Sequence, residues 1–167
     1  MSRPVSVSPV PQAPDLRVAL VVSTYHDGIT ERLANGALEA LAQAGIASSA
    51  VERLDVPGAY EIPFGARTAA ASGRIDAVVC LGCLIKGETP HFDYIASAVS
   101  HGIMQASLSH GTPMAFGVLT VNSLEEAEAR VPAGPGNKGY EAAVAVVTMA
   151  RLARDWQPGG TGQGRDR

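Results

Sequence analysis

The sequence predicts an α/β fold of three layers, in which a four-stranded parallel sheet is doubly wound, flavodoxin-like, with helices on both faces. Two observations predict it: short apolar runs that are typical of buried strands, and longer segments between them with apolar residues three or four positions apart. The strands are expected at residues 17–23, 49–55, 77–85 and 114–120. Strands that alternate with helices pair in parallel through right-handed crossovers, so helices cover both faces.

Five segments are expected to be helices, and several carry their own start or stop signals. They are residues 29–44, 63–71, 94–109, 123–130 and 138–156. Gly45 and Gly111 follow the first and the third segment as stops. Ser123 is placed to cap the fourth, and Glu126 three residues later completes a capping box.

The length and composition fit one domain. The chain has 167 residues, of which 46% are hydrophobic and 17% charged, enough apolar material for one core. We expect a proline-rich N-terminal arm at residues 1–15, a folded domain at 16–156 and a disordered glycine-rich tail at 157–167.

Charge and hydropathy exclude two classes of partner. The net charge is −3 with scattered lysines and arginines, unlike the basic stripe of a nucleic-acid-binding protein. No apolar run approaches the ~18 residues that span a bilayer, and the N-terminus lacks the pattern of a signal peptide. We therefore expect a cytoplasmic protein without nucleic-acid or membrane partners.

Cys80 and Cys83 form a C-x-x-C pair inside an apolar run. A redox pair normally lies at a helix N-terminus, where the thiol pKa is lowered. A zinc site needs about four ligands, and the sequence has no second pair. We expect two cysteines packed in a strand and no metal site.

Polar segments follow all four predicted strands, at residues 24–27, 56–61, 86–91 and 120–122. Ligands of parallel sheets bind beyond the carboxyl ends of the strands, so we expect a site there. The third segment opens a helix, whose free N–H groups and dipole bind anions. An ordinary strand–helix turn with Pro90 in the first helical turn explains the same residues.

Four side chains in or near these segments suit proton transfer or ligand binding. His91 lies beside the anion site and His26 follows the first strand, although a lone histidine is more often structural. Glu61, next to an aromatic residue, offers an acceptor to a heterocycle or caps a helix. Arg130 is free to bind phosphate bidentately or satisfies the end of its own helix.

Four strings in these regions resemble the lumazine synthase family, in its order and spacing across about residues 17–152. They are residues 56–63 (VPGAYEIP), 87–94 (GETPHFDY), 116–120 (FGVLT) and 136–143 (GNKGYEAA). The resemblance implies a transferase of riboflavin biosynthesis. Its reaction, the penultimate step, condenses 5-amino-6-(D-ribitylamino)uracil with 3,4-dihydroxy-2-butanone 4-phosphate to 6,7-dimethyl-8-ribityllumazine, without a metal, flavin or nucleotide cofactor.

The resemblance also implies roles for single residues. His91 corresponds to the proton-transfer residue, and Glu88, Thr89 and Arg130 to the phosphate site. The uracil and its ribityl chain would be bound by Tyr25, Ala59, Tyr60, Glu61, Cys83, Leu84, Ile85 and Phe116. Phe116 and Arg130 would come from a neighbouring subunit. The sequence departs from the family at Tyr25-His26, where Phe-Asn is common, and at Lys86, where arginine is common.

The resemblance implies a homo-oligomer with active sites between subunits. The family forms pentamers, and in some members twelve pentamers close into an icosahedral capsid of 60 subunits, which residues 134–139 do not obviously obstruct. Riboflavin synthase is a further partner that it suggests. Two other functions stay open, a flavin- or lumazine-binding shell without catalysis and a flavodoxin-like electron carrier, although residues 23–28 are a poor phosphate loop.

Overall fold

The structure, a computed structural model, describes residues 9–159. Residues 1–8 of the predicted arm and 160–167 of the predicted tail lie outside the described residues. Within the predicted arm, the N–H of Ala13 donates to Ala44 O (2.9 Å) and the Gln12 side chain to Gln43 O (2.7 Å). This part of the arm therefore lies against the C-terminal end of the first helix.

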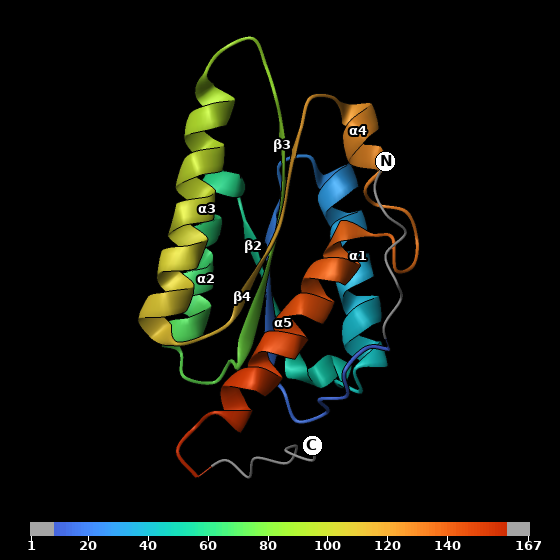
Figure 1. Cartoon of the computed structure of the whole chain (residues 1–167). Coiled ribbons are helices and arrows are strands. Elements are labelled where there is room, and N and C mark those ends of the chain that lie inside the picture. Colours follow the sequence, from blue (N-terminus) through green and yellow to red (C-terminus); the bar gives the residue numbers. More distant parts are fainter. Residues whose placement is uncertain (1–8, 160–167) are drawn as a thin grey trace, which may run out of the picture.

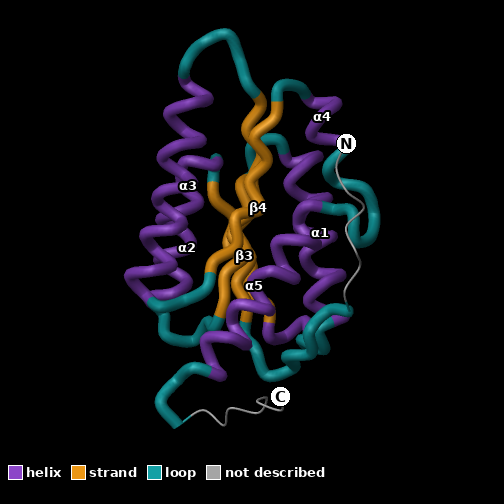
Figure 2. The backbone as a smooth tube through the Cα atoms, viewed as in Figure 1, coloured by secondary structure: helices purple, strands orange, loops and turns teal. Residues whose placement is uncertain are grey.

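The predicted three-layer fold is confirmed. The strands β1 (Val18–Ser23), β2 (Val51–Val56), β3 (Ala77–Ile85) and β4 (Met114–Val121) form one parallel sheet in the order β2-β1-β3-β4. One face is covered by α1 (Asp27–Gln43) and α5 (Lys138–Asp155), the other by α2 (Ile62–Ala71) and α3 (His91–His110), as Figures 1 and 2 show. Short helices at Ser48–Ala50 (η1), Ala59–Glu61 (η2) and Leu124–Glu128 (α4) complete the chain.

The glycine stops and the Ser123 cap are confirmed, with small shifts in the helix bounds, whereas the predicted capping box is only half formed. Gly45 and Gly111 have left-handed φ angles of 81° and 62°. The Ser123 hydroxyl accepts from the N–H of Glu126 (3.2 Å), whose carboxylate accepts from the N–H of Asn122 (2.9 Å) rather than Ser123. The helix α3 begins at His91, one turn before the predicted start, because Pro90 takes the cap position without a side-chain cap bond.

The core has two parts, one on each face of the sheet. Successive β3 side chains alternate between them: Leu81 and Cys83 pack under α1 and α5, whereas Val78 and Cys80 pack under α2 and α3. The predicted packing of the two cysteines is confirmed, since both are buried and free. Because they lie in different cores, they form neither a disulfide nor a shared metal site.

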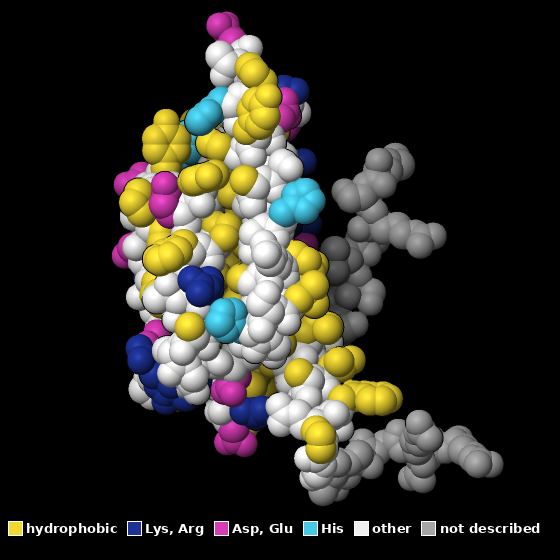
Figure 3. Space-filling model, turned by 90° about the vertical axis from the view of Figure 1, so that its left-hand side faces the viewer, with side chains coloured by type: hydrophobic (Ala, Val, Ile, Leu, Met, Phe, Trp, Pro, Cys, Tyr) yellow, Lys and Arg dark blue, Asp and Glu magenta, His cyan; other side chains and the backbone are white. Residues whose placement is uncertain are grey.

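The outer surface of α2 and α3 carries exposed apolar side chains, visible over this face in Figure 3. Phe64 is 71% exposed, and Tyr94, Met104 and Leu108 are exposed as well. Clusters of large exposed apolar side chains are typical of contact surfaces. Among residues 9–159, no helix is both long and apolar enough to cross a membrane.

A buried amide joins α1 to the start of α5. Asn137, 2% exposed, accepts from the N–H groups of Gly139 (2.8 Å) and Tyr140 (3.4 Å) and so caps α5. Its side-chain NH₂ donates to Arg32 O (2.9 Å) and Pro132 O (3.0 Å). Both the oxygen and the NH₂ group of this buried amide therefore have hydrogen-bond partners, as burial requires.

Two glycines make this contact possible. A β-carbon at Gly36 would overlap the Asn137 amide, and one at Gly139 would overlap the backbone of Leu33. The backbones of α1 and α5 are thus in contact at the point where Asn137 bridges the two helices.

We expect Gly139→Ala to destabilise the protein by about 1–3 kcal/mol, because overpacking against rigid backbone forces the helices apart. Gly136→Ala is the matched control: its new carbon would meet only a Pro132 ring carbon at 3.4 Å, an ordinary contact. Urea unfolding at one fixed protein concentration measures both. Equal stabilities of the two variants would contradict the close packing of α1 on α5.

Candidate functional site

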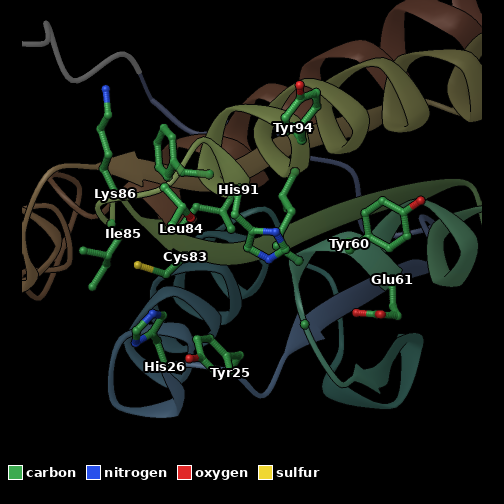
Figure 4. Close-up of a pocket in the computed structure, with 16 residues that line it drawn as sticks. Tyr25, His26, Tyr60, Glu61, Cys83, Leu84, Ile85, Lys86, His91 and Tyr94 are labelled. Carbon is green, nitrogen blue, oxygen red and sulfur yellow. The ribbon is translucent and has the colours of Figure 1, made fainter.

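A cavity of about 860 Å³ opens at the carboxyl edge of the sheet (Figure 4). Four segments line it: the loop after β1, the turn after β2, the end of β3 and the first turns of α3. The lining residues are Tyr25, His26, Gly58, Ala59, Tyr60, Glu61, Cys83, Leu84, Ile85, Lys86, Gly87, Thr89, His91, Phe92, Tyr94 and Ile95. The segments that the sequence predicted after the first three strands therefore meet in one place.

The cavity has an apolar floor and aromatic walls. Ala59 and Cys83 are buried at its base, whereas Tyr25, Tyr60 and Tyr94 are more than half exposed. Aromatic faces that solvent reaches in this structure are available to stack on a flat ligand. The lining therefore suits a flat heterocycle better than a small anion.

The Glu61 carboxylate is exposed at the cavity and makes no helix-capping bond. It lies over Gly58, where a β-carbon would come within 3.1 Å of its Oε2 atom. The Glu61 side chain thus does not cap the helix, which was the alternative role expected from the sequence. Its oxygens are free to accept hydrogen bonds from a ligand.

The chain that enters α3 presents unpaired donors. Within residues 9–159, no protein acceptor binds the N–H groups of Gly87, Glu88, Thr89, His91 and Phe92. They lie at the positive end of a helix of 20 residues. Glu88 does not line the cavity, so the structure does not bring this predicted residue to the site. This arrangement can bind an anion beside the His91 ring.

His91 is exposed at the first position of α3, and Figure 4 shows its ring within the cavity between the β3 end and Tyr60. Lys86 also lines the cavity, but its side chain extends away from the His91 ring in this view. The histidine is therefore available for proton transfer, while the lysine amine is turned outward.

Burial keeps the two cysteine thiols protonated. It raises the pKa of Cys80 to about 12 and that of Cys83 to about 11. Cys83 is only 2% exposed although it lines the cavity. The sulfur is a packing surface for a ligand and not a nucleophile.

Two predicted residues, Phe116 and Arg130, lie elsewhere. They line a separate depression of about 340 Å³ outside β4, together with Lys138, Glu141 and the adjacent β4 residues. This depression shares no lining residue with the first cavity. One chain therefore does not bring Phe116 and Arg130 to His91.

Arg130 adopts the helix-end geometry that its sequence position allowed and leaves part of its guanidinium free. One terminal nitrogen, Nη1, donates to Glu126 O (2.8 Å) at the end of α4. The rest of the exposed guanidinium has no protein acceptor among the described residues. It can still meet an anion on its free side.

Lys138 and Glu141 were not predicted as site residues, yet they form an ion pair of 2.8 Å beside Arg130. Both belong to the string at residues 136–143, and their spacing of three on a helix start was the available signal. Phe92, Tyr94 and Ile95 were also missed as cavity residues, although two of them stand in the string at 87–94. In the described part of the chain, no group of three or more His, Cys, Asp or Glu residues is placed to hold a metal ion.

The fold and the cavity define an α/β domain with a small-molecule site at the carboxyl edge of a parallel sheet. The chain belongs to the 6,7-dimethyl-8-ribityllumazine synthase family, whose model matches residues 15–154. The resemblance found in the four strings is thereby confirmed. Membership makes the protein a transferase of riboflavin synthesis.

We expect neither thiol to react quickly with Ellman's reagent at pH 8 in the native protein, whereas both react in denaturant. Because burial raises both pKa values, the folded protein favours the neutral thiols. Their contribution to the free energy of unfolding is complete below the ordinary thiol pKa of about 9 and is lost as the pH rises through 11–12. Cys80→Ala and Cys83→Ala variants assign any reactive sulfur. A native thiol that reacts within seconds would contradict the buried geometry.

Proposed function

We propose that the protein condenses 5-amino-6-(D-ribitylamino)uracil with 3,4-dihydroxy-2-butanone 4-phosphate to 6,7-dimethyl-8-ribityllumazine, phosphate and water, the penultimate step of riboflavin biosynthesis. The observation that carries the proposal is the juxtaposition in one cavity of aromatic walls, the free Glu61 carboxylate and an open helix start beside His91. Family membership supports the same reaction.

In this proposal the uracil lies against Tyr25, with the backbone of Ala59 and Tyr60 and the Glu61 carboxylate binding its polar edge and ribityl chain. Glu61 accepts from N–H or O–H groups, because an ionised carboxylate only accepts. Cys83, Leu84 and Ile85 at the end of β3 form the apolar floor. These contacts orient the amine of the uracil toward the α3 start.

The phosphate of the second substrate occupies the α3 start, held by N–H groups of residues 87–89 and of the first turn. This position places the ketone next to His91. Holding both substrates together supplies a large part of the acceleration, since it replaces a bimolecular encounter by a step within one complex.

The reaction then needs proton transfers more than any other assistance. The primary amine attacks the ketone, and loss of water gives an imine. Phosphate leaves by β-elimination, taking the bonding electrons as the proton on the neighbouring carbon is removed, and the enol tautomerises. The ribitylamino nitrogen closes the ring with loss of a second water. His91 is the side chain placed to move these protons.

The proposal includes assembly. Phe116 and Arg130 of one chain would complete the cavity of the next, since in a single chain they line a separate depression. A pentamer has such head-to-tail contacts between neighbours, and the exposed apolar side chains on α2 and α3 support subunit contacts. A shell of twelve pentamers, riboflavin synthase as a partner and a cytoplasmic location stay predictions of the same proposal.

The direct test mixes both substrates with the purified protein, follows lumazine absorbance and weighs the particle by light scattering. Turnover supports the enzyme. Tight binding of product without turnover would instead favour a storage shell, and stoichiometric bound FMN an electron carrier.

We expect His91→Ala to lower kcat without abolishing turnover, by no more than about 10²- to 10⁴-fold, because proton transfer is one of several contributions. His110→Ala is the matched control, a histidine in the last turn of the same helix and outside the cavity. Steady-state kinetics measure kcat for both variants. Full turnover by His91→Ala would show that its assigned role is wrong.

We expect Arg130→Ala to raise the KM for the phosphate substrate roughly 10- to 100-fold, the scale of a lost charged hydrogen bond. Coexpressing it with His91→Ala chains tests the site between subunits. If neighbours share a site, roughly a quarter of randomly formed sites hold both intact residues. At a phosphate-substrate concentration below its KM, turnover by the mixture should then exceed that of either variant alone. A mixture that only averages the two variants would place both residues in one chain's site.

A further inference from the structure

We propose that His26 is a positioning residue, whose imidazole holds the Tyr25 ring in the orientation that stacks on the uracil. This inference rests on the proposed function, in which Tyr25 is the stacking surface. It gives a role to the residue that departs from the family's common asparagine at this position.

The backbone of the β1–α1 loop is anchored, but the Tyr25 ring is not. The N–H of Thr24 donates to Val56 O (2.8 Å) and that of Tyr25 to Pro57 O (3.2 Å), which fixes the loop on the end of β2. The Tyr25 side chain is 67% exposed. An exposed phenol ring rotates between staggered positions unless a neighbour restrains it.

His26 is that neighbour. The ring centroids of Tyr25 and His26 are 4.6 Å apart and their planes meet at 73°, the edge-on geometry that aromatic pairs favour. No other aromatic pair of this kind occurs among residues 9–159. Both rings line the cavity, and Figure 4 shows them next to each other.

The backbone of His26 makes the pair possible. Consecutive side chains of a strand point to opposite sides, so two adjacent rings would not meet in extended chain. His26 has φ 59° and ψ 50°, and it is the single non-glycine residue with positive φ in the described chain. This left-handed turn breaks the alternation and brings the two rings together.

The helix does not use the His26 side chain. The His26 carbonyl accepts from the N–H groups of Ile29 (2.9 Å) and Thr30 (3.1 Å) at the start of α1, while the imidazole makes no capping bond. Backbone and side chain therefore have separate tasks, and a substitution can remove one without the other.

Asparagine and glycine both tolerate left-handed φ, so His26→Asn and His26→Gly keep the turn and remove the ring. We expect both to weaken binding of the aminouracil alone by about 2- to 10-fold, the worth of an edge-on pair. The KM for this substrate rises by the same factor, whereas that for the phosphate substrate does not. Calorimetric titration without the ketone measures the binding, and melting temperatures confirm that both variants fold.

A double-mutant cycle separates positioning from direct contact. In a Tyr25→Ala background, His26→Asn should cause no further loss, because there is no ring to hold. An equal loss in both backgrounds would mean that His26 touches the ligand itself, and no loss with Tyr25 intact would remove the role; either result overturns the inference. Product formation by the unmodified chain decides the proposed function separately, since the cycle is read from aminouracil binding alone.

Discussion

The parallel direction of all four strands is the constraint on which the site depends. Because each strand ends at the same edge, segments far apart in sequence arrive together: Ser23 pairs with Val56 at the ends of β1 and β2, and Val22 with Leu81 in β3. Tyr25, Tyr60 and His91 follow these ends and share one cavity. Burial of both faces leaves this edge as the place where polar groups can gather without cost to the core.

A second constraint, the close approach of α1 and α5, fixes the loop that joins Arg130 to the start of α5. Asn137 bonds to both helices and to Pro132, and the N–H of Lys138 donates to Arg130 O (3.0 Å). The loop between α4 and α5 is therefore held at both ends by buried or backbone hydrogen bonds. Arg130 lies at the start of this anchored loop, which suits the phosphate contact that the proposed function gives it.

Local patterns predicted what is locally determined. Strand and helix periods gave the sheet and its layers, and the left-handed stops at Gly45 and Gly111 followed from glycine alone. For the start of α3 at His91, Pro90 was the available signal, whereas the apolar spacing indicated only the helix from residue 94 and no side chain caps this end. The separation of Phe116 and Arg130 from the cavity was implied by the family resemblance and not by any local pattern. The need for glycine at 36 and 139 could not be predicted, because it depends on which helices touch.

The charges that line the cavity of one chain do not match a phosphate-binding site. The α3 start offers dipole and N–H groups to an anion. Among the described residues, Lys86 is the only Lys or Arg that lines the cavity, and it points away from His91, so no lining cation faces the position proposed for the phosphate. The cations that could face it are Arg130, whose free side is open, and Lys138, already paired with Glu141. A doubly charged phosphate leaving during β-elimination gains most from a planar, permanently charged fork. Under the proposed function, Arg130 of a neighbouring chain would meet that requirement, and catalysis would then depend on assembly and hence on protein concentration.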